Sequence, residues 1–496
     1  MTEGKRVVII GAGAGGLAAA SDLAHAGLNV TVVERAACEG GKMRQIEAGG
    51  VLIDAGPTVF TMRWVFEALF ENGGRKFSEA LDLTPASILA RHAWRDGSQL
   101  DLHADIAASA EAIGTFAGAQ QARAYLQFVA ECRDIHDTLK DSFMAAQKPT
   151  APGLVLRVGD LRSMLRTRPF DTYWSMLKQR FADPRLRQLF GRYATYVGSS
   201  PFKAPATLML IAHVEQEGVW MVDGGMRALA RALRHLAESS GAKFRFGADA
   251  EQILVRGGRV SGVRLRTGEE LPADAVVFNG DTAALGDGLL GDGPRQAVDR
   301  TPRSQRSLSA VTWCVKTRTR GLPLSYHNVM FGEDYEDEFN AVFKRRTISH
   351  RPTVYVCAQD RRDNAQPEGP ERLLMLVNAP PDGDRTAASR EDDGPMEECV
   401  LSHLSACGLT LDGGLGQSVI TTPQDFHALF PATGGALYGR ANHSSMASFA
   451  RAGSRAGLEG LYLAGGSVHP GPGVPMATLS GRLAAARLLS DLPNAR

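Results

Sequence analysis

A run of spaced glycines followed by one glutamate is the first part of the chain whose residue types could do chemistry. Residues 11–16 (GAGAGG) match the pattern Gly-x-Gly-x-x-Gly and directly follow a short apolar run. In this pattern Gly11 makes a tight turn, Gly13 leaves space for a pyrophosphate, and Gly16 lets a helix pack closely on a strand. Glu34 lies 23 residues past Gly11, at the end of a second apolar run, where a carboxylate accepts hydrogen bonds from ribose hydroxyls. These residues predict the binding of a dinucleotide.

A second glycine-rich segment lies near the other end of the chain. Residues 460–476 (GLYLAGGSVHPGPGVPM) read as an apolar strand, a Gly-Gly pair, a stiff Pro/Gly loop and the start of a small-residue helix. Pro475 suits the first turn of that helix, whose free N–H groups would face the loop and could seat an anion or an electron-rich ring. His469 is expected to be an ordinary loop residue and not a ligand. A ligand held from both ends of the chain is long, which again points to a dinucleotide.

Two further tight turns stand near the first motif. Residues 39–44 (EGGKMR) place a Gly-Gly pair beside Lys42, so this segment could hold more of the same ligand. The alternative is a solvated loop. Residues 54–58 (DAGPT) form another compact turn, for which a plain type II turn is the alternative.

The groups that usually carry acid–base or metal chemistry are sparse. The histidines do not stand at metal-ligand spacing, and the six scattered cysteines form no CxxC pair, so we expect neither a metal site nor a disulfide framework. The cysteine pattern favours a reducing, cytosolic compartment. Glu215 could handle a proton, but we expect it to be an exposed helix carboxylate. No other catalytic base can be named.

The elements that would position these residues follow an α/β order. Residues 5–34 read as one strand–helix–strand unit of a parallel sheet, helical patterns dominate much of 63–239, and strand-like runs return after 243. This order predicts a Rossmann-like nucleotide-binding domain interrupted by two insertions. We expect the domain to comprise residues 1–72, 223–300 and 440–496, with a mostly helical insertion at 73–222 and a β-rich insertion at 301–439.

Composition limits the class of protein. The 496 residues are 44% hydrophobic and 22% charged, with a net charge of +1, which gives no reason to expect a nucleic-acid partner. No run of 18 uncharged apolar residues exists, so we expect no membrane span. The first apolar run begins too early for a secretory signal peptide to precede it, so none is expected. A position on a membrane surface stays compatible with these observations.

Taken together, these motifs resemble the bacterial-type carotenoid desaturases, relatives of phytoene desaturase, which are FAD flavoproteins of the amine-oxidase-like group. The resemblance covers nearly the whole chain. It extends to residues 186–190, 198, 201–202, 218–225, 327–332 and 352–356. The N-terminal motif is shared by many flavoproteins, whereas the loop at residues 468–475 is far more specific.

Within that family the chain most resembles the 1-hydroxycarotenoid 3,4-desaturases, also called methoxyneurosporene dehydrogenases. The likeness is carried by residues 189–198 (LFGRYATYVG) and 434–440 (GGALYGR). Residues 465–468 (GGSV) depart from the Gly-Ala-Gly-Thr that precedes the His-Pro in phytoene desaturases.

The resemblance implies FAD as cofactor and the oxidation of a C–H bond in an apolar, acyclic carotenoid such as hydroxyneurosporene. It also implies that the helical insertion lies against the membrane in which this substrate dissolves. The protein would then be cytoplasmic and peripheral to the inner or photosynthetic membrane. The motifs and the resemblance together assign these residues to FAD: Gly11, Gly13, Ala14, Gly15, Gly16, Glu34, Arg35, Gly41, Lys42, Gly56, Pro57, Thr58, Ala250, Asp281, Gly465, Gly466, Gly473, Val474, Pro475 and Met476.

Several alternatives remain open from the sequence. A phytoene or neurosporene desaturase would share most of these motifs. A flavin amine oxidase would need an aromatic cage, and the chain has 9 tyrosines and 5 tryptophans. A nicotinamide dehydrogenase would leave the C-terminal loop unexplained. A prenyl-lipid carrier of the GDP-dissociation-inhibitor type would bind no flavin. The electron acceptor, the oligomeric state and the number of bonds desaturated are not determined by the sequence.

Overall fold

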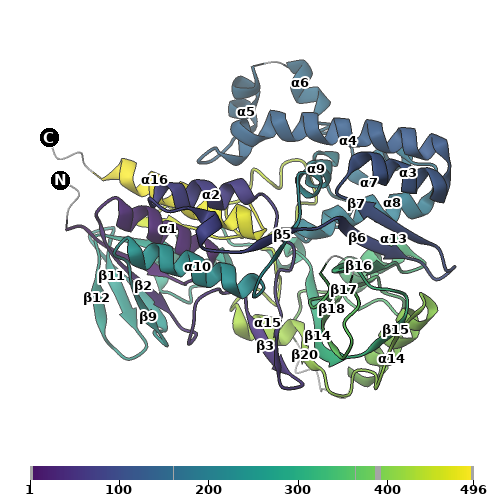
Figure 1. The fold of residues 1–496 in the computed structure, drawn as a ribbon. Coiled ribbons are helices and arrows are strands. Elements are labelled where there is room, and N and C mark those ends of the chain that lie inside the picture. The colour runs from purple at the N-terminus through teal and green to yellow at the C-terminus, as the bar shows by residue number, and fades with distance from the viewer. Residues whose placement is uncertain (1–3, 160, 363–364, 386–392, 493–496) are drawn as a thin grey trace.

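The computed structural model of the protein describes residues 4–159, 161–362, 365–385 and 393–492. Figure 1 shows two sheet-containing regions side by side, with a helical region above them and both chain ends at the side of the first region. Helices α5 (Ala151–Val158) and α6 (Leu161–Arg166) lie at the outer end of the helical region (Figure 1).

A five-stranded parallel sheet organises the first region. Its strand order is β21-β13-β1-β2-β9, and all its neighbouring strands are parallel. The central strands β1 and β13 are almost entirely apolar because helices and a second small sheet cover both faces. Their bounds are β1 (Arg6–Ile10), β2 (Asn29–Glu34), β9 (Lys243–Phe246), β13 (Ala275–Phe278) and β21 (Leu461–Leu463). The carboxyl ends of parallel strands share one edge, so this topology brings the residues after β1, β2, β13 and β21 together.

Helices with small residues pack on this sheet. The main ones are α1 (Ala14–His25), α2 (Arg63–Asn72), α10 (Met226–Ser239) and α16 (Val474–Asp491). Helices α1 and α16 touch through their backbones, because a Cβ atom added at Gly481 would lie 2.0 Å from the carbonyl oxygen of Gly15. The first and last helices of the chain are thereby locked together.

A seven-stranded sheet organises the second region, in the order β20-β14-β18-β17-β16-β6-β7. All its strand pairs are antiparallel except β16 with β6. The bounds are β6 (Ile88–Ala93), β7 (Gln99–His103), β14 (Ser309–Thr317), β16 (His327–Met330), β17 (Val354–Ala358), β18 (Glu371–Ala379) and β20 (Val419–Thr421). Strands β6 and β7 fall within the range for which the sequence predicted mostly helix. Each is short, and a tight turn at Gly97 joins them, so they leave little local signal.

The helical region fills most of residues 106–216. Its elements are α3 (Ile106–Ala117), α4 (Ala119–Leu139), the π-helical turn η2 (Lys140–Met144), α5, α6, α7 (Tyr173–Arg180), α8 (Pro184–Gly191), η3 (Arg192–Val197), η4 (Ala206–Met209) and α9 (Leu210–Gln216). Aromatic side chains build its core. Phe190 lies 4.8 Å, centroid to centroid, from both Phe128 and Phe181.

Shorter elements complete the fold. A three-stranded sheet comprises β10 (Ala250–Arg256), β11 (Arg259–Leu265) and β12 (Glu270–Pro272). Three strand pairs are β3 (Gln45–Ala48) with β4 (Val51–Asp54), β5 (Leu83–Pro85) with β8 (Trp220–Val222), and β15 (Thr319–Gly321) with β19 (Leu409–Leu411). The remaining helical segments are η1 (Phe77–Glu79), α11 (Thr282–Gly286), α12 (Asp292–Arg295), η5 (Arg303–Gln305), α13 (Tyr335–Asn340), η6 (Ala341–Arg345), α14 (Asp393–Ala406) and α15 (Pro423–Leu429).

Among the described residues, none of the helices combines the length and the hydropathy needed to cross a bilayer.

The contact between α1 and α16 predicts that adding one methyl group at Gly481 lowers the stability of the protein. Gly481→Ala should destabilise the protein by about 1–3 kcal/mol, because the neighbouring backbone of Gly15 cannot move away as a flexible side chain could. Gly114→Ala in α3 is the matched control, since an added Cβ there would lie 3.5 Å from its nearest neighbour. That change should be neutral or stabilise by up to about 1 kcal/mol. Thermal unfolding of both variants measures the difference, and equal melting temperatures would contradict the packing argument.

Candidate cofactor and substrate site

The glycine turn after β1 closes around one side chain that the sequence did not single out as a site residue. Asn279 follows β13 and donates from Nδ2 to the Gly11 carbonyl oxygen at 3.2 Å. A Cβ atom added at Gly13, Gly15 or Gly16 would lie 3.0, 2.7 or 2.8 Å from the Asn279 side chain. Gly11 has φ +100°, a backbone conformation that favours glycine. The signal for Asn279 was the polar turn directly after a buried strand.

Glu34 is tied to the same turn. Its Oε2 accepts a hydrogen bond from the Ala12 N–H at 2.7 Å, and its Oε1 accepts one from the Ala36 N–H at 2.9 Å. A carboxylate has about four lone-pair positions, so acceptor capacity remains for ribose hydroxyls. Glu34 therefore fixes the turn in addition to the sugar-binding role that the sequence predicts for it.

Arg35 and Ala250 lie beside Glu34 but contact different partners. Arg35 is exposed and donates to the Ala428 and Leu429 carbonyl oxygens at the end of α15. The segment that leads to Ala250 runs along the end of β2, where the Ala248 N–H donates to the Glu34 carbonyl oxygen at 2.9 Å. These two predicted residues thus lie at the Glu34 end of the turn.

The second Gly-Gly pair packs directly against the first glycine turn. The Gly40 N–H donates to the Ala12 carbonyl oxygen at 2.8 Å, and a Cβ atom added at Gly41 would lie 3.3 Å from the Cα of Gly13. Gly56, the residue before Pro57, approaches from the other side, because a Cβ atom there would lie 1.8 Å from the Lys42 carbonyl oxygen. The predicted turns at 39–44 and 54–58 are therefore neighbours.

Lys42 is half-buried and carries an uncommon set of contacts. Its Nζ donates to the Leu437 carbonyl oxygen and lies 5.1 Å from the centroid of the Phe430 ring. Burial lowers the pKa of Lys42, and the nearby Asp281 carboxylate partly offsets this. Asp281 also caps α11, accepting from the Ala283 N–H at 3.0 Å.

The C-terminal loop returns to the same edge of the sheet. Gly465, with φ +111°, follows β21, and its N–H donates to the Ser480 hydroxyl at 3.2 Å. The Gly466 carbonyl oxygen accepts from Arg451 at 3.3 Å. Gly473, with φ +112°, precedes α16, whose first turn holds Val474, Pro475 and Met476. The structure thus brings both ends of the chain together at the glycine turn.

Arg451 is a second residue that sequence reasoning missed. It is buried and donates to the carbonyl oxygens of Tyr438, Arg440 and Gly466, so it joins the 434–440 segment to the C-terminal loop. Burial lowers its pKa to about 10, an effect that Asp281 partly offsets. No local motif surrounds Arg451, so the sequence carries no signal for this role.

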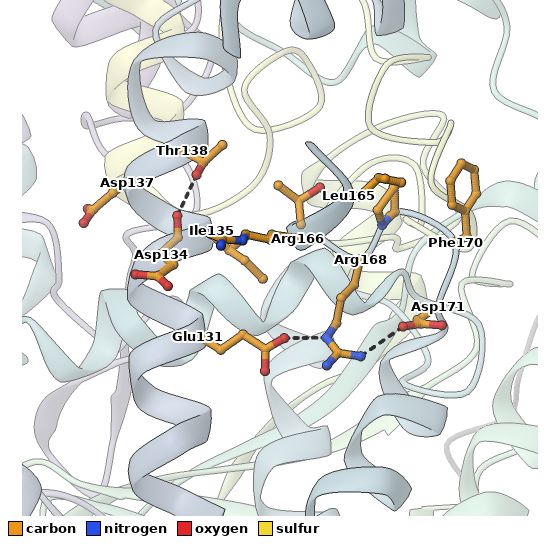
Figure 2. A pocket seen from close by; sticks show the side chains of 12 residues that line it. Glu131, Asp134, Ile135, Asp137, Thr138, Leu165, Arg166, Arg168, Phe170 and Asp171 are labelled. Carbon is orange, nitrogen blue, oxygen red and sulfur yellow. Dashed lines mark hydrogen bonds and ion pairs between the residues drawn. The ribbon is translucent and has the colours of Figure 1, made fainter. Parts of the chain in front are cut away.

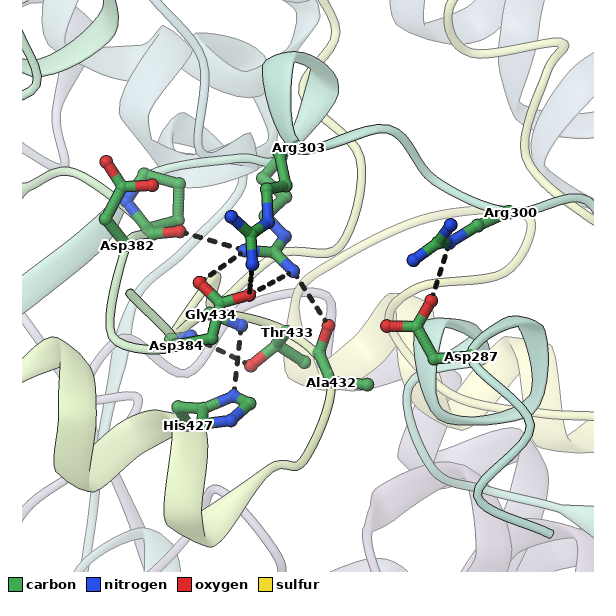
Figure 3. Close-up of polar contacts among 12 residues, drawn as sticks. Asp287, Arg300, Arg303, Asp382, Asp384, His427, Ala432, Thr433 and Gly434 are labelled. Atoms are coloured by element: carbon green, nitrogen blue, oxygen red, sulfur yellow. Dashed lines mark hydrogen bonds and ion pairs between the residues drawn. The ribbon is translucent and has the colours of Figure 1, made fainter. Parts of the chain in front are cut away.

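Figure 3 shows how the 432–434 turn, which leads to the acceptor of Lys42, is held. Arg306 pairs with Asp384 and donates to the Ala432 carbonyl oxygen at 3.2 Å, while the Gly434 N–H donates to His427 at 3.2 Å. The segment that contacts Lys42 is therefore anchored independently of Lys42.

These residues fit FAD. Neither α1 nor α16 has a side chain that caps its start, so the backbone N–H groups there remain available to the oxygens of a pyrophosphate or a flavin ring. The glycines around Asn279 leave a surface without side chains, and Glu34 keeps acceptor capacity at the sugar end.

Glu215 is buried, and the expectation of an exposed helix carboxylate is wrong. It is 3% exposed, accepts hydrogen bonds from the Tyr196 hydroxyl at 2.7 Å and from the Tyr193 hydroxyl, and lies 3.6 Å from Nη2 of Arg192. Residues of η3 cover it, and a helical pattern alone does not reveal this tertiary contact. A buried carboxylate persists when hydrogen bonds and an opposite charge compensate it.

A chain of hydrogen bonds links the predicted cofactor turn to the large sheet. The Thr58 hydroxyl lies 2.7 Å from the Tyr355 hydroxyl, which lies 2.7 Å from Nδ1 of His327. Burial, reinforced by the charge of Arg192, lowers the pKa of His327 to about 3, so this imidazole is neutral at pH 7. The predicted cofactor turn is thus hydrogen-bonded to β17 and, through it, to β16.

The histidines play structural roles that the sequence did not reveal. His469 is buried, and its Nε2 donates to the Phe143 carbonyl oxygen at 3.0 Å, which joins the C-terminal loop to η2. Packing of α4 against α9 brings His136, His213 and Glu217 together, with ligand atoms within 4.8 Å of one another. Ligands that share one tetrahedral zinc ion lie about 3.4 Å apart, so we assign no ion to this looser cluster.

An open pocket of about 880 Å³ lies between α4 and residues 165–171, which comprise the end of α6 and the loop after it (Figure 2). Glu131, Asp134 and Arg168 are among its lining residues, and Arg168 bridges Glu131 and Asp171. None of the residues predicted to bind FAD lines it.

Comparison with known proteins defines the class. Residues 14–489 match the model of the flavin containing amine oxidoreductase family, so the chain belongs to that family. The predicted amine-oxidase-like flavoprotein fold is confirmed, and FAD is the cofactor of this enzyme.

The particular relatives act on carotenoids. The chain is 53% identical to a hydroxyneurosporene desaturase of Rubrivivax gelatinosus, over 98% of this chain and 94% of that protein. It is 44% identical to a hydroxyneurosporene desaturase of Cereibacter sphaeroides, over 98% of both. A zeta-carotene-forming phytoene desaturase of Myxococcus xanthus is 31% identical, over 99% of this chain and 95% of that protein.

Solved structures share the fold at low identity. An oxidoreductase from Methanosarcina mazei aligns with a TM-score of 0.60 at 16% identity, covering 96% of this chain and 99% of that one. Putrescine oxidase bound to putrescine aligns with a TM-score of 0.61 at 15% identity, covering 99% and 100%.

The crowding at the glycine turn predicts the effect of Gly13→Val. The valine Cβ would lie 3.0 Å from Asn279, a contact that a small shift relieves, but its methyl groups would occupy the place expected for the pyrophosphate. The purified variant should lose most of its flavin absorbance while it keeps its far-UV circular dichroism. Gly416→Val is the control, because a Cβ there would meet nothing within 4 Å. A folded Gly13→Val protein with full flavin content would overturn this placement.

The buried histidines predict a loss of stability in acid. Burial lowers the pKa of His469 to about 4. Between about pH 6.5 and 4, the His469 imidazole is therefore protonated in the unfolded state and neutral in the folded state. This contribution to stability is present above pH 6.5 and is lost as the pH falls. His469→Asn should reduce the change in the free energy of unfolding between pH 7.5 and 5 by roughly 2 kcal/mol. Urea unfolding at both pH values measures it, with the exposed His350→Asn as control. The same change in wild type and His469→Asn would refute the assignment.

Proposed function

We propose that this FAD-dependent carotenoid desaturase performs 3,4-desaturation of a 1-hydroxylated acyclic carotenoid such as hydroxyneurosporene. The observation that carries the proposal is the identity of 44–53%, over 98% of the chain, to proteins named hydroxyneurosporene desaturase. Sequence motifs of the same subfamily at residues 189–198 and 434–440 support it.

FAD held at the predicted cofactor site would supply the two-electron oxidation that converts the C3–C4 single bond of the carotenoid into a double bond. The protein contributes position and the exclusion of water. Thr58, Tyr355 and His327 form one hydrogen-bonded row from the cofactor turn to the sheet. Aromatic packing in the adjacent helical core keeps water out, and a conjugated polyene needs few polar partners beyond that. Glu215 is the buried carboxylate of this region, and we propose no catalytic role for it.

A phytoene-type desaturase is the second candidate, because the Myxococcus xanthus relative is 31% identical over nearly the full chain. An amine oxidase would share the fold, but the relatives above 40% identity carry carotenoid desaturase names. A flavin-free lipid carrier is disfavoured by the complete set of cofactor motifs.

We propose the three-part division that the sequence predicts. Residues 1–72, 223–300 and 440–496 each supply strands to the parallel sheet and form the FAD-binding domain. Residues 73–222 form the substrate- and membrane-facing region, apart from β6 and β7, which extend the large sheet. Residues 301–439 form the β-rich substrate domain.

We further propose that the helical region docks on the membrane surface from the cytoplasmic side. Leu156 in α5 is 81% exposed and Phe170 is 86% exposed, and Leu165 between them is 55% exposed. Figure 1 places α5 and α6 at the outer end of the molecule, and Figure 2 shows Leu165, at the end of α6, and Phe170, on the loop that follows, beside the pocket. Apolar side chains flanked by Arg157 and Arg166 suit an interface with anionic lipid headgroups.

A substrate panel tests the proposed reaction. Holoenzyme incubated with hydroxyneurosporene, neurosporene and phytoene should add one double bond to hydroxyneurosporene, at a kcat/KM at least about 10-fold above the other two. Absorption spectra and product masses read the outcome. Efficient stepwise desaturation of phytoene, without preference for the hydroxylated compound, would refute the substrate assignment and leave the desaturase class standing.

The membrane surface has its own test. Replacing Leu156 and Phe170 together by Ser should weaken binding to liposomes with anionic lipids, because about 1.5–3 kcal/mol of apolar transfer is lost for each side chain. Co-flotation with liposomes measures the bound fraction. A control that replaces exposed Leu52 and Leu289 by Ser should bind as the wild type does. Equal binding by both double variants would contradict the docking surface.

A further inference from the structure

Arg192 is a buried cation with nitrogen donors that have no partner. It is 7% exposed, and its Nη1 donates to the Tyr196 hydroxyl at 2.7 Å. Its Nε and Nη2 make no hydrogen bond, and the Glu215 carboxylate lies 3.6 Å from Nη2, too far for one. A guanidinium carries five N–H groups, and leaving such donors buried without an acceptor is costly.

A purely structural ion pair in the same chain looks different. Arg361 is 2% exposed, and its Nε and Nη2 both donate to Glu371 at 2.8 Å. Its Nη1 donates to the Leu324 carbonyl oxygen at 3.1 Å. Each nitrogen of Arg361 therefore donates a hydrogen bond within the protein, whereas Nε and Nη2 of Arg192 donate none.

Two histidines with unpartnered ring nitrogens, His92 and His327, lie on the neighbouring strands β6 and β16, whose register sets Val329 opposite His92. His92 donates from Nδ1 to the Leu100 carbonyl oxygen at 3.1 Å, which leaves its Nε2 as an acceptor, and Nε2 has no partner. Nε2 of His327 is also buried and unpartnered. In the tautomer whose Nδ1–H donates to Tyr355, Nε2 of His327 is an acceptor as well. The charge of Arg192 contributes to the lowered pKa of both imidazoles, after burial.

We propose that Arg192 and His327 form the subsite that binds the tertiary hydroxyl of the carotenoid. The guanidinium donates to the hydroxyl oxygen, and the hydroxyl hydrogen is donated to Nε2 of His327. Glu215, Tyr193 and Tyr196 are positioning residues that neutralise and orient the guanidinium. This inference rests on the proposed function, because it explains how a hydroxylated substrate is chosen over its unhydroxylated analogue.

The chemistry of the substrate requires such a subsite to lie near the flavin. The hydroxyl oxygen on C1 is three bonds from C3, so it lies within about 4 Å of the carbon that is oxidised. His327 meets this requirement through Tyr355 and Thr58, the last of which belongs to a predicted cofactor turn. A site that donates to a substrate hydroxyl rejects the analogue without it, because its polar groups then stay unpaired.

The experiment compares kcat/KM of flavin-loaded enzyme for hydroxyneurosporene and neurosporene, and takes their ratio. Arg192→Gln combined with Glu215→Gln removes both charges, so no lone buried ion remains. This double variant should lower the ratio by about 10- to 100-fold. Arg192→Lys keeps a charge and should retain an intermediate ratio. Arg361→Lys disturbs a buried pair elsewhere and should leave the ratio unchanged even if it lowers the melting temperature.

The outcomes separate the inference from the proposed function. If the wild type shows no preference for the hydroxylated compound, the substrate assignment fails and the subsite fails with it. If the wild type discriminates but the flavin-loaded double variant keeps its ratio, or loses activity toward both substrates equally, the subsite is overturned and the function stands. If the double variant does not retain flavin, the same ratio of kcat/KM is measured for His327→Leu instead. A ratio equal to the wild type in His327→Leu then overturns the subsite, and a reduced ratio supports it.

Discussion

The absence of a side chain at a few positions is the constraint on which the structure depends. A Cβ atom added at Gly11, Gly13, Gly15, Gly16 or Gly465 would come within 3.2 Å of Asn279. At Gly481 it would come within 2.0 Å of Gly15. The turns after β1 and β21 therefore pack against Asn279, which lies in the turn after β13. Helices α1 and α16 touch through backbone atoms without side chains between them. This close approach creates a smooth surface edged by helix N-termini that a dinucleotide can follow.

The sequence predicted the parts of this site that local pattern encodes. The glycine turn and Glu34 belong to one strand–helix–strand unit, and the C-terminal loop carries its own proline and glycine pattern, so their spacing is informative. Asn279 acts through contacts with residues far away along the chain, and the polar turn that holds it does not reveal those contacts. No local motif marks Arg451. The hydrogen bonds of Glu34 to Ala12 and Ala36 were not predicted, since they depend on the folded turn, and its sugar-binding role stays a prediction.

The buried polar cluster of Glu215, Tyr193, Tyr196 and Arg192 is a second case in which a local sequence pattern does not encode tertiary contacts. A carboxylate at position 215 in a helical pattern reads as solvent-facing, because the pattern carries no information on what η3 places over it. Only the tertiary structure shows Tyr193 and Tyr196 donating to that carboxylate. Buried ion pairs contribute little to net stability, so a pair that also leaves donors unsatisfied is poorly explained as a fold-stabilising device. Strands β6 and β7 escaped prediction for a related reason, since a short hairpin becomes part of a large sheet only through pairing with β16.

The arrangement of the parallel sheet has a consequence for how the protein is made. Strand β1 pairs with β13, which in turn pairs with β21 near the end of the chain. The flavin platform therefore closes only after β21 and α16 have been synthesised, long after the first strand–helix–strand unit has left the ribosome. Until then, the apolar edge of β1 and the glycine face of α1 lack their packing partners and are open to aggregation or chaperone capture. FAD that binds only the completed platform favours the folded chain over the unfolded one, so its supply raises the fraction of chain in the native state.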